Sequence, residues 1–258
     1  MENKYIRKIT IPCYDTDALG RMKIFAFMNY AQEVANEHAE FMGFGYETLI
    51  KQRVVWILSR MHIHFDSYPQ WKDKVELKTW HKGLDGLFFL RDFQLSSVAD
   101  DKVLGCATTS WLNLNLDTRK LVRDPEFARE DTAIKEDVLK QPCEKLRIPR
   151  AYQMDYIREH EIVYSDIDFN GHANNAMYAF WAIDAIGNDY MLKHQISDFY
   201  INFNHEAKAG DKIAIFRHFD QEDGKPVVMI EGKIVDDPQE PLKGTSSFVV
   251  KCIFNSIN

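Results

Sequence analysis

The sequence predicts an α+β protein in which one structural unit occurs twice, each copy a long helix wrapped by an antiparallel sheet. The first observation is a repeated motif, because Asp15–Arg21 and Asp166–His172 both read D-x-D-x-x-G followed by a basic residue. The second is the order of periodicities, since in each half a helical pattern follows the motif and several strand-like runs follow the helix. A motif and a layout that recur together indicate a duplicated domain.

Further segments of the two halves support the duplication. They match at one common offset: Phe65–Pro69 with Phe203–Ala207, Asp73–Val75 with Asp211–Ile213, and Ala107–Thr109 with Thr245–Ser247. Each match is short, but all of them keep the same order along the chain.

In the first unit, apolar residues recur at helical spacing between Ile24 and Met42, which predicts a helix that is apolar on most faces and therefore buried. The strands that follow are predicted at Val54–Phe65, Val75–Trp80, Phe88–Ser96 and Leu104–Leu116. Gly83–Gly86 is expected to be a turn between strands.

In the second unit, a helix is predicted over Ala176–Leu192. The strands that follow are predicted at Asp198–Asn204, Lys212–Phe219, Val227–Val235 and Thr245–Phe254. A polar, proline-containing stretch separates the units. We therefore expect an N-terminal domain at 1–120, a linker at 121–157 and a C-terminal domain at 158–258.

Composition restricts the class of function. The 258 residues carry 32 Lys and Arg against 39 Asp and Glu, a net charge of −7, which disfavours nucleic acid as a partner. No segment reaches the roughly 18–20 apolar residues that span a bilayer, and no secretory signal is recognisable. The four cysteines form no C-x-x-C pair, so we expect a cytoplasmic protein with no membrane association, no cofactor and no metal site.

Polar side chains concentrate in the motif of the second unit. Asp168, Asn170 and His172 alternate, so in an extended segment their side chains would share one face. Asn170-Gly171 favours a tight turn, and Asn174 or Asn175 can cap the helix that follows. The alternatives at this point are a turn with a helix cap, or a catalytic site in which helix N–H groups hold an oxyanion.

The segment Asp168-x-Asn170-x-His172-x-Asn174-Asn175 resembles the D-x-N-x-H-x-N-N segment of acyl-ACP thioesterases, and the duplicated layout extends the resemblance over nearly the whole chain. The resemblance implies a tandem of two hot-dog domains with the catalytic residues in the second. It also implies a catalytic glutamate in the segment after the next strand, which places that role on Glu206.

Two differences qualify the resemblance. Plant members commonly carry a cysteine after the glutamate, whereas this chain has Ala207, so a water-based hydrolysis is favoured over an acyl-cysteine. In the first unit, Leu19, Arg21 and Tyr68 stand where Asn170, His172 and Glu206 stand in the second, so we expect that unit to be chemically inert and to hold the acyl tail. Its candidate wall residues are Phe25, Phe27, Met28, Trp56, Phe88 and Phe89.

The function predicted on this basis is hydrolysis of acyl-acyl carrier protein to free fatty acid in fatty acid biosynthesis. Asp168, Asn170, His172 and Glu206 are the catalytic candidates, and which carboxylate is the base stays open. An acidic carrier requires a local basic patch on an acidic chain, with the candidates Arg119, Lys120, Arg123, Lys145, Arg147 and Arg150. An acyl-CoA thioesterase and a non-catalytic acyl-binding module are the alternatives, and association into a homodimer is left open.

Overall fold

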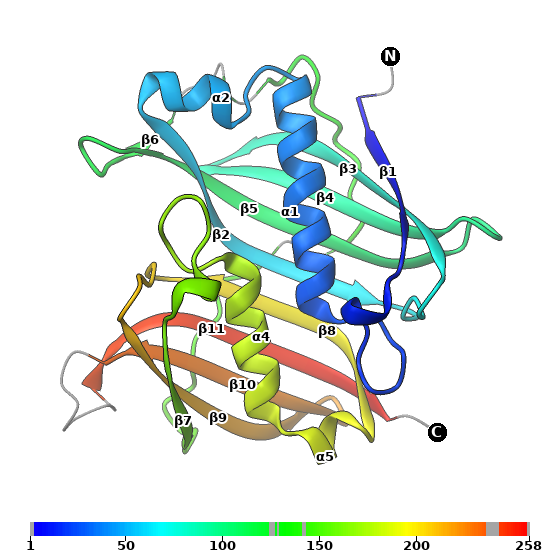
Figure 1. Ribbon diagram of the computed structural model, residues 1–258, viewed down its shortest axis with the longest axis vertical. Helices are drawn as coiled ribbons and strands as arrows, with labels where there is room; N and C mark the ends of the chain where they lie inside the picture. Colours follow the sequence, from blue (N-terminus) through cyan, green and yellow to red (C-terminus); the bar gives the residue numbers. More distant parts are fainter. Residues whose placement is uncertain (1–2, 124–126, 128, 141–142, 236–242, 257–258) are drawn as a thin grey trace. The chain divides into compact units, whose positions relative to one another are not determined.

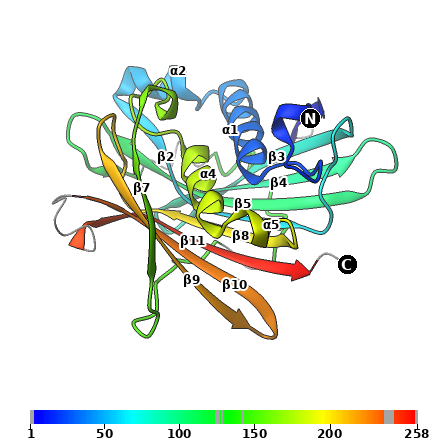
Figure 2. The same cartoon turned by 60° about the horizontal axis from the view of Figure 1, so that its bottom comes forward.

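The structure is a computed structural model that describes residues 3–123, 127, 129–140, 143–235 and 243–256. The chain forms two compact units, residues 1–144 and 145–258. In each unit one main helix lies on one face of an antiparallel sheet (Figure 1, Figure 2). The predicted arrangement of a helix on an antiparallel sheet, present twice, is confirmed.

The first unit has its strands in the order β1–β3–β4–β5–β2, all antiparallel. Their bounds are β1 Tyr5–Thr10, β2 Val54–Phe65, β3 Lys74–Asp85, β4 Phe88–Ser97 and β5 Val103–Asn115, and the short β6 Leu121–Val122 pairs with β5. The helix α1 (Ile24–Phe41) buries most of its apolar side chains, including Phe27, Met28 and Val34, whereas Phe41 at its end is exposed. A short helix α2 (Tyr46–Leu49) follows it.

The second unit has its strands in the order β8–β11–β10–β9–β7, again antiparallel. Their bounds are β7 Asp155–Glu161, β8 His194–Phe203, β9 Lys212–Glu222, β10 Lys225–Ile234 and β11 Thr245–Ser256. The helix α4 (Asn175–Ile186) lies on this sheet and buries alanines at 176, 179, 182 and 185. Such small side chains allow close approach of helix and sheet.

The single helix predicted over Ala176–Leu192 is wrong in its extent. The structure has α4 and a separate short helix α5 (Asn188–Met191), because Gly187 between them adopts φ +101°. Arg217 Nη1 donates to the carbonyl oxygens of Ala185 (2.7 Å) and Ile186 (2.8 Å). A cation at the last carbonyls of α4 stabilises its C-terminal end.

Hydrogen bonds that recur at matching positions demonstrate the duplication. In both motifs the second aspartate donates its N–H to the carbonyl of the basic residue, at 2.8 Å for Asp17 and 2.9 Å for Asp168. Two further pairs recur: Met22 N to Pro69 O with Ala173 N to Ala207 O, and Ile11 N to Asp73 O with Ile162 N to Asp211 O. These bonds confirm the first three motif matches.

The fourth match is wrong. The N–H of Ser67 donates to Leu104, and that of His205 donates to Ser247, so Ser247 corresponds to Leu104 and not to Thr109. The offset changes because the connection before β11, residues 235–244, is longer than the connection before β5, residues 98–102.

Two edge strands and one bulge are not predicted by the sequence patterns. β1 and β7 are half-exposed strands whose polar residues obscure the apolar alternation. Of the glycines expected in one turn, Gly86 lies in the turn between β3 and β4, whereas Gly83 lies inside β3 beside a register shift and adopts φ +84°. Glycine in a strand is typical of a bulge.

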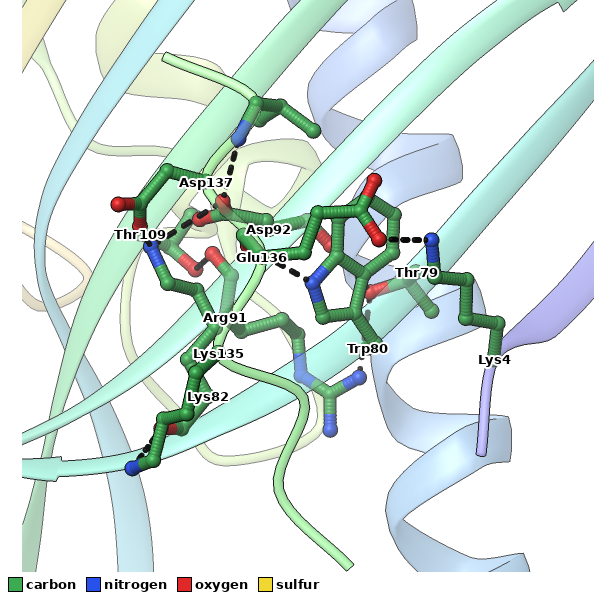
Figure 3. A network of polar contacts seen from close by, with 11 residues as sticks. Lys4, Thr79, Trp80, Lys82, Arg91, Asp92, Thr109, Lys135, Glu136 and Asp137 are labelled. Carbon is green, nitrogen blue, oxygen red and sulfur yellow. Dashed lines mark hydrogen bonds and ion pairs between the residues drawn. The ribbon is translucent and has the colours of Figure 1, made fainter. Parts of the chain in front are cut away.

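Part of the segment expected as a linker packs on the first unit. Val138 N donates to Asp92 Oδ2 at 3.1 Å, and Trp80 Nε1 donates to the carbonyl of Glu136 at 3.3 Å (Figure 3). The buried Asp92 carboxylate also pairs with Lys82 Nζ at 3.2 Å. The compact units therefore meet in sequence at Glu144 and Lys145, inside the segment 121–157.

In the part of the chain that the structure describes, no helix is both long and apolar enough to span a bilayer.

Candidate active site

The motif of the second unit forms a tight loop ahead of α4. Gly171 N donates to the Asp168 carbonyl (3.0 Å), and Asp168 N donates to the carbonyl of His172 (2.9 Å). The Asp168 carboxylate accepts the N–H of Asn170 at 2.8 Å. Gly171 adopts φ +80°, a left-handed conformation that glycine reaches without strain.

This loop corrects the expectation of an extended segment. A turn at Asn170-Gly171 reverses the chain, so Asp168, Asn170 and His172 do not alternate along a strand. Asn170 lies at the exposed tip, whereas Asp168 and His172 are partly buried at the base of the loop. The turn dipeptide has a stronger effect on the local backbone than the alternation of polar residues.

The start of α4 is capped by the side chain of Asn174, as predicted. Its Oδ1 accepts the N–H of Ala176 at 2.9 Å, and its carbonyl accepts the N–H of Met177 at 2.9 Å. Two N–H groups at the helix start are therefore occupied by the cap itself. They do not supply the oxyanion donors expected at this helix end.

Glu206 is brought to the loop by the segment that follows β8. Ala173 N donates to the carbonyl of Ala207 at 2.9 Å, which fixes the two segments side by side. The Nε2 atom of His172 lies 3.1 Å from Oε2 of Glu206. The two side chains are 29% and 37% exposed, so a substrate can reach the pair.

The corresponding positions of the first unit hold a different pair. Arg21 Nη2 lies 2.7 Å from Asp17 Oδ2, and the guanidinium carbon lies 6.0 Å from the ring centre of Tyr68. Leu19 N donates to Asp17 Oδ1, as Asn170 N does to Asp168. The turn is thus retained in the first unit, while the imidazole and the second carboxylate are absent from it.

No thiol stands beside Glu206. Ala207 occupies the next position and is fully buried. Burial raises the pKa of Cys106 to about 11 and that of Cys143 to about 12, and it also raises the pKa of Cys252. These three thiols are protonated at neutral pH, and a thiol is a far weaker nucleophile than a thiolate.

Of the side chains expected to line an acyl tunnel, Trp56 and Phe89 lie in one apolar cluster with Leu49, Val54 and Phe127. Their ring centres are 4.9 Å apart. The other candidates divide between the buried Phe27 and Met28 and the partly buried Phe25 and Phe88. The six basic candidates for docking are all exposed: Arg119, Lys120 and Arg123 in the first unit, and Lys145, Arg147 and Arg150 in the second.

Asp166, the first residue of the motif, and Tyr178 are not among the site residues predicted from the sequence. Asp166 is buried, and its Oδ2 lies 2.9 Å from His160 Nε2 and accepts the N–H of Val163. Tyr178 on α4 contacts the segment that carries Glu206. A comparison of Tyr178 with Phe27, which occupies the same place after the first motif, is the signal in the sequence that points to this tyrosine.

The fold and this pair together define a duplicated hot-dog protein in which the histidine and glutamate of the second motif region are replaced by Arg21 and Tyr68 in the first. Residues 2–130 match the model of the acyl-ACP thioesterase N-terminal domain, and residues 149–239 match that of the C-terminal domain. The chain belongs to the acyl-ACP thioesterase family.

Solved structures support the fold. An acyl-ACP thioesterase from Bacteroides thetaiotaomicron superposes with a TM-score of 0.82 at 24% identity, covering 98% of both chains. The 12:0-ACP thioesterase from Umbellularia californica superposes with a TM-score of 0.88 at 21% identity, covering 99% of this chain and 95% of the other.

Sequence relatives include plant proteins. The chain is 26% identical to the chloroplastic oleoyl-acyl carrier protein thioesterase of Coriandrum sativum over 81% of its own length and 61% of that protein's. It is 29% identical to an Arabidopsis thaliana oleoyl-acyl carrier protein thioesterase over 80% and 60%. The chain thus spans about three fifths of the length of these relatives.

Proposed function

We propose that this protein hydrolyses the thioester of an acyl-acyl carrier protein and releases a free fatty acid. The observation that carries the proposal is the His172–Glu206 pair, present in the second unit and replaced by Arg21 and Tyr68 in the first. Membership of the acyl-ACP thioesterase family, matched over both units, supports the substrate class.

In this proposal Glu206 is the general base. Its carboxylate is accessible and lies against His172, whereas the Asp168 carboxylate accepts a backbone N–H within its own turn. Glu206 takes a proton from water as the water oxygen bonds to the thioester carbonyl carbon. His172 orients the carboxylate, and Asp168 maintains the loop that presents His172.

The developing oxyanion needs hydrogen-bond donors that the helix cap does not use. The side-chain amide of Asn170 and the backbone N–H of Asn175 are the donors we assign to it. Collapse of the tetrahedral intermediate breaks the carbon–sulfur bond, and the proton held by Glu206 returns to the departing sulfur. The products are a carboxylic acid and the carrier thiol.

We further propose a division of labour between the units. The first unit binds the acyl chain through its apolar side chains, with Trp56 and Phe89 as the leading candidates. The exposed arginines and lysines at 119–123 and 145–150 contact the acidic carrier protein, since the chain as a whole is acidic. Four unpaired cysteines are consistent with a reducing, cytoplasmic location. Assembly into a homodimer is a separate proposal, decided by the molar mass in solution.

The test is a panel of acyl-carrier proteins of different chain length, with the matching acyl-CoA thioesters assayed in parallel for thiol release. The proposal expects turnover of acyl-carrier proteins with a higher kcat/KM than the acyl-CoA of the same chain. A preference for acyl-CoA would overturn the carrier assignment. Binding of acyl groups without release of thiol from either series would overturn the enzymatic assignment.

A further inference from the structure

Two buried hydroxyl groups hold the backbone on both sides of Glu206. On one side, Tyr178 Oη accepts the N–H of Ala207 at 3.0 Å. On the other side, Ser247 Oγ donates to the carbonyl of His205 at 2.8 Å. Ser247 lies near the Tyr178 hydroxyl and contributes to the pKa of that phenol.

Each hydroxyl has one backbone partner beside Glu206. Ser247 Oγ uses its proton on the carbonyl of His205, and Tyr178 Oη accepts the N–H of Ala207. Both side chains are almost fully buried, where a polar group without a hydrogen-bond partner is costly.

Ala207 connects these hydroxyls to the motif loop. Its N–H is bound by Tyr178, and its carbonyl accepts the N–H of Ala173, the residue after His172. The position of Glu206 relative to His172 thus depends on one residue whose two backbone polar groups are both engaged. If the bond from Tyr178 is lost, Ala207 keeps only the bond of its carbonyl to the motif loop.

The first unit provides an internal comparison. Phe27 occupies the place of Tyr178, since each is the fourth residue after a helix N-cap, Lys23 and Asn174. The ring of Phe27 lies 5.5 Å from Phe65 in an edge-on contact. The ring of Tyr178 makes the same contact, also at 5.5 Å, with the corresponding Phe203.

The two hydroxyls are absent from the corresponding positions of the first unit. Leu104 stands in the place of Ser247, and Pro69, which has no N–H, stands in the place of Ala207. The corresponding ring of Phe27 therefore packs without a hydroxyl in the unit where Tyr68 replaces Glu206. Because a buried hydroxyl is costly to desolvate, its presence in the second unit calls for a role beyond packing.

From these contacts we infer that Tyr178, assisted by Ser247, is the positioning residue that holds Glu206 against His172. The inference rests on the proposed role of Glu206 as the base. Burial raises the pKa of Tyr178 to about 12, so the phenol remains a neutral hydroxyl throughout the working range of the site. Tyr178 touches neither water nor substrate in this role.

The test compares Tyr178→Phe with Tyr190→Phe, a matched loss of one hydroxyl from a ring on α5 that stacks on His194. Tyr178→Phe is expected to fold, because Phe27 shows that the bare ring packs at this position. Its kcat should fall about ten- to a hundredfold with KM unchanged within about twofold, since a small displacement of a catalytic group reduces turnover rather than binding. Tyr190→Phe should retain the wild-type kcat.

A double-mutant cycle separates positioning from a general structural effect. In a Glu206→Gln background, Tyr178→Phe should cause little further loss, because the group that it positions no longer acts as a base. Equal losses in both backgrounds would overturn the inference, as would a wild-type kcat in Tyr178→Phe. If the wild-type protein itself releases no thiol from any acyl-carrier protein, the proposed function fails; an active wild type with an active Tyr178→Phe overturns the positioning role alone.

Discussion

The Nε2 atom of His172 lies 3.1 Å from Oε2 of Glu206, although the two residues belong to different segments on either side of α4 and β8. The backbone bond from Ala173 to Ala207 runs beside this contact and keeps the segments together. The same backbone bond exists in the first unit between Met22 and Pro69, without an imidazole or a glutamate beside it. Duplication therefore supplied the scaffold, and substitution at the paired positions supplied the imidazole and the carboxylate.

Replacing the proposed base should abolish most of the activity without unfolding the protein. Glu206→Gln is expected to lower kcat by about 10²- to 10⁴-fold, the usual contribution of a general base, with KM little changed. The side chain is partly exposed, so the thermal unfolding midpoint should move little. Steady-state kinetics and a thermal melt check both points. A Glu206→Gln protein with wild-type kcat would remove Glu206 from the mechanism.

Asp168 is expected to act mainly through the turn. Asp168→Ala removes the acceptor of the Asn170 N–H and should lower both activity and stability, the latter by about 1 kcal/mol. Asp168→Asn keeps an oxygen acceptor at the same position and should recover part of both. Activity in Asp168→Asn as low as in Glu206→Gln would show instead that the charge of Asp168 takes part in the chemistry.

Stability of the first unit should decrease as the pH falls below about 6.5. His38 Nδ1 lies 2.8 Å from Arg91 Nη1. The same Nη1 atom donates to Thr79 Oγ1 (Figure 3). Burial, with the nearby Arg91, lowers the pKa of His38 to about 3 and that of His81 to about 4. In the unfolded chain these histidines take up protons near their ordinary pKa of 6.5, whereas in the folded chain they do not. The stabilisation present above that pH is therefore lost on acidification.

Between pH 6.5 and 4, the free energy of unfolding should change by at most about 1.4 kcal/mol per pH unit for each histidine ring. Urea unfolding at a series of pH values measures it. His38→Asn keeps an acceptor for Arg91 and should reduce the pH dependence of the unfolding free energy by the contribution of one histidine. An identical slope in wild type and His38→Asn would contradict this account.

Alkylation should leave the activity intact. Cys13 is the exposed cysteine, and the pKa values of Cys106, Cys143 and Cys252 are all raised by burial. Iodoacetamide at neutral pH is expected to modify Cys13 first in the native protein, as mass spectrometry can show. Thioesterase activity should survive this modification, with Cys13→Ser as the control. Loss of activity in step with the labelling of a buried cysteine would reinstate a thiol mechanism.

Much of each unit was predictable because the signals are local. The apolar run of Val54–Phe65 predicts β2 with its observed bounds, and the Asn170-Gly171 dipeptide predicts the turn that the structure contains. β1 and β7 were not predicted because edge strands need little apolar surface. The sequence predicts a turn at Gly83 because a glycine in a bulge and a glycine in a turn look alike in sequence.

The sequence by itself determined the duplicated α+β layout, the family resemblance, and the identity of the residues that differ between the two motifs. Tertiary structure alone decided that His172 meets Glu206 and that Tyr178 and Ser247 hold the glutamate segment. The physical reason is the distance along the chain between the partners. Local spacing fixes a helix, a strand or a turn, whereas a contact between α4, β11 and the segment after β8 arises only when helix and sheet pack together.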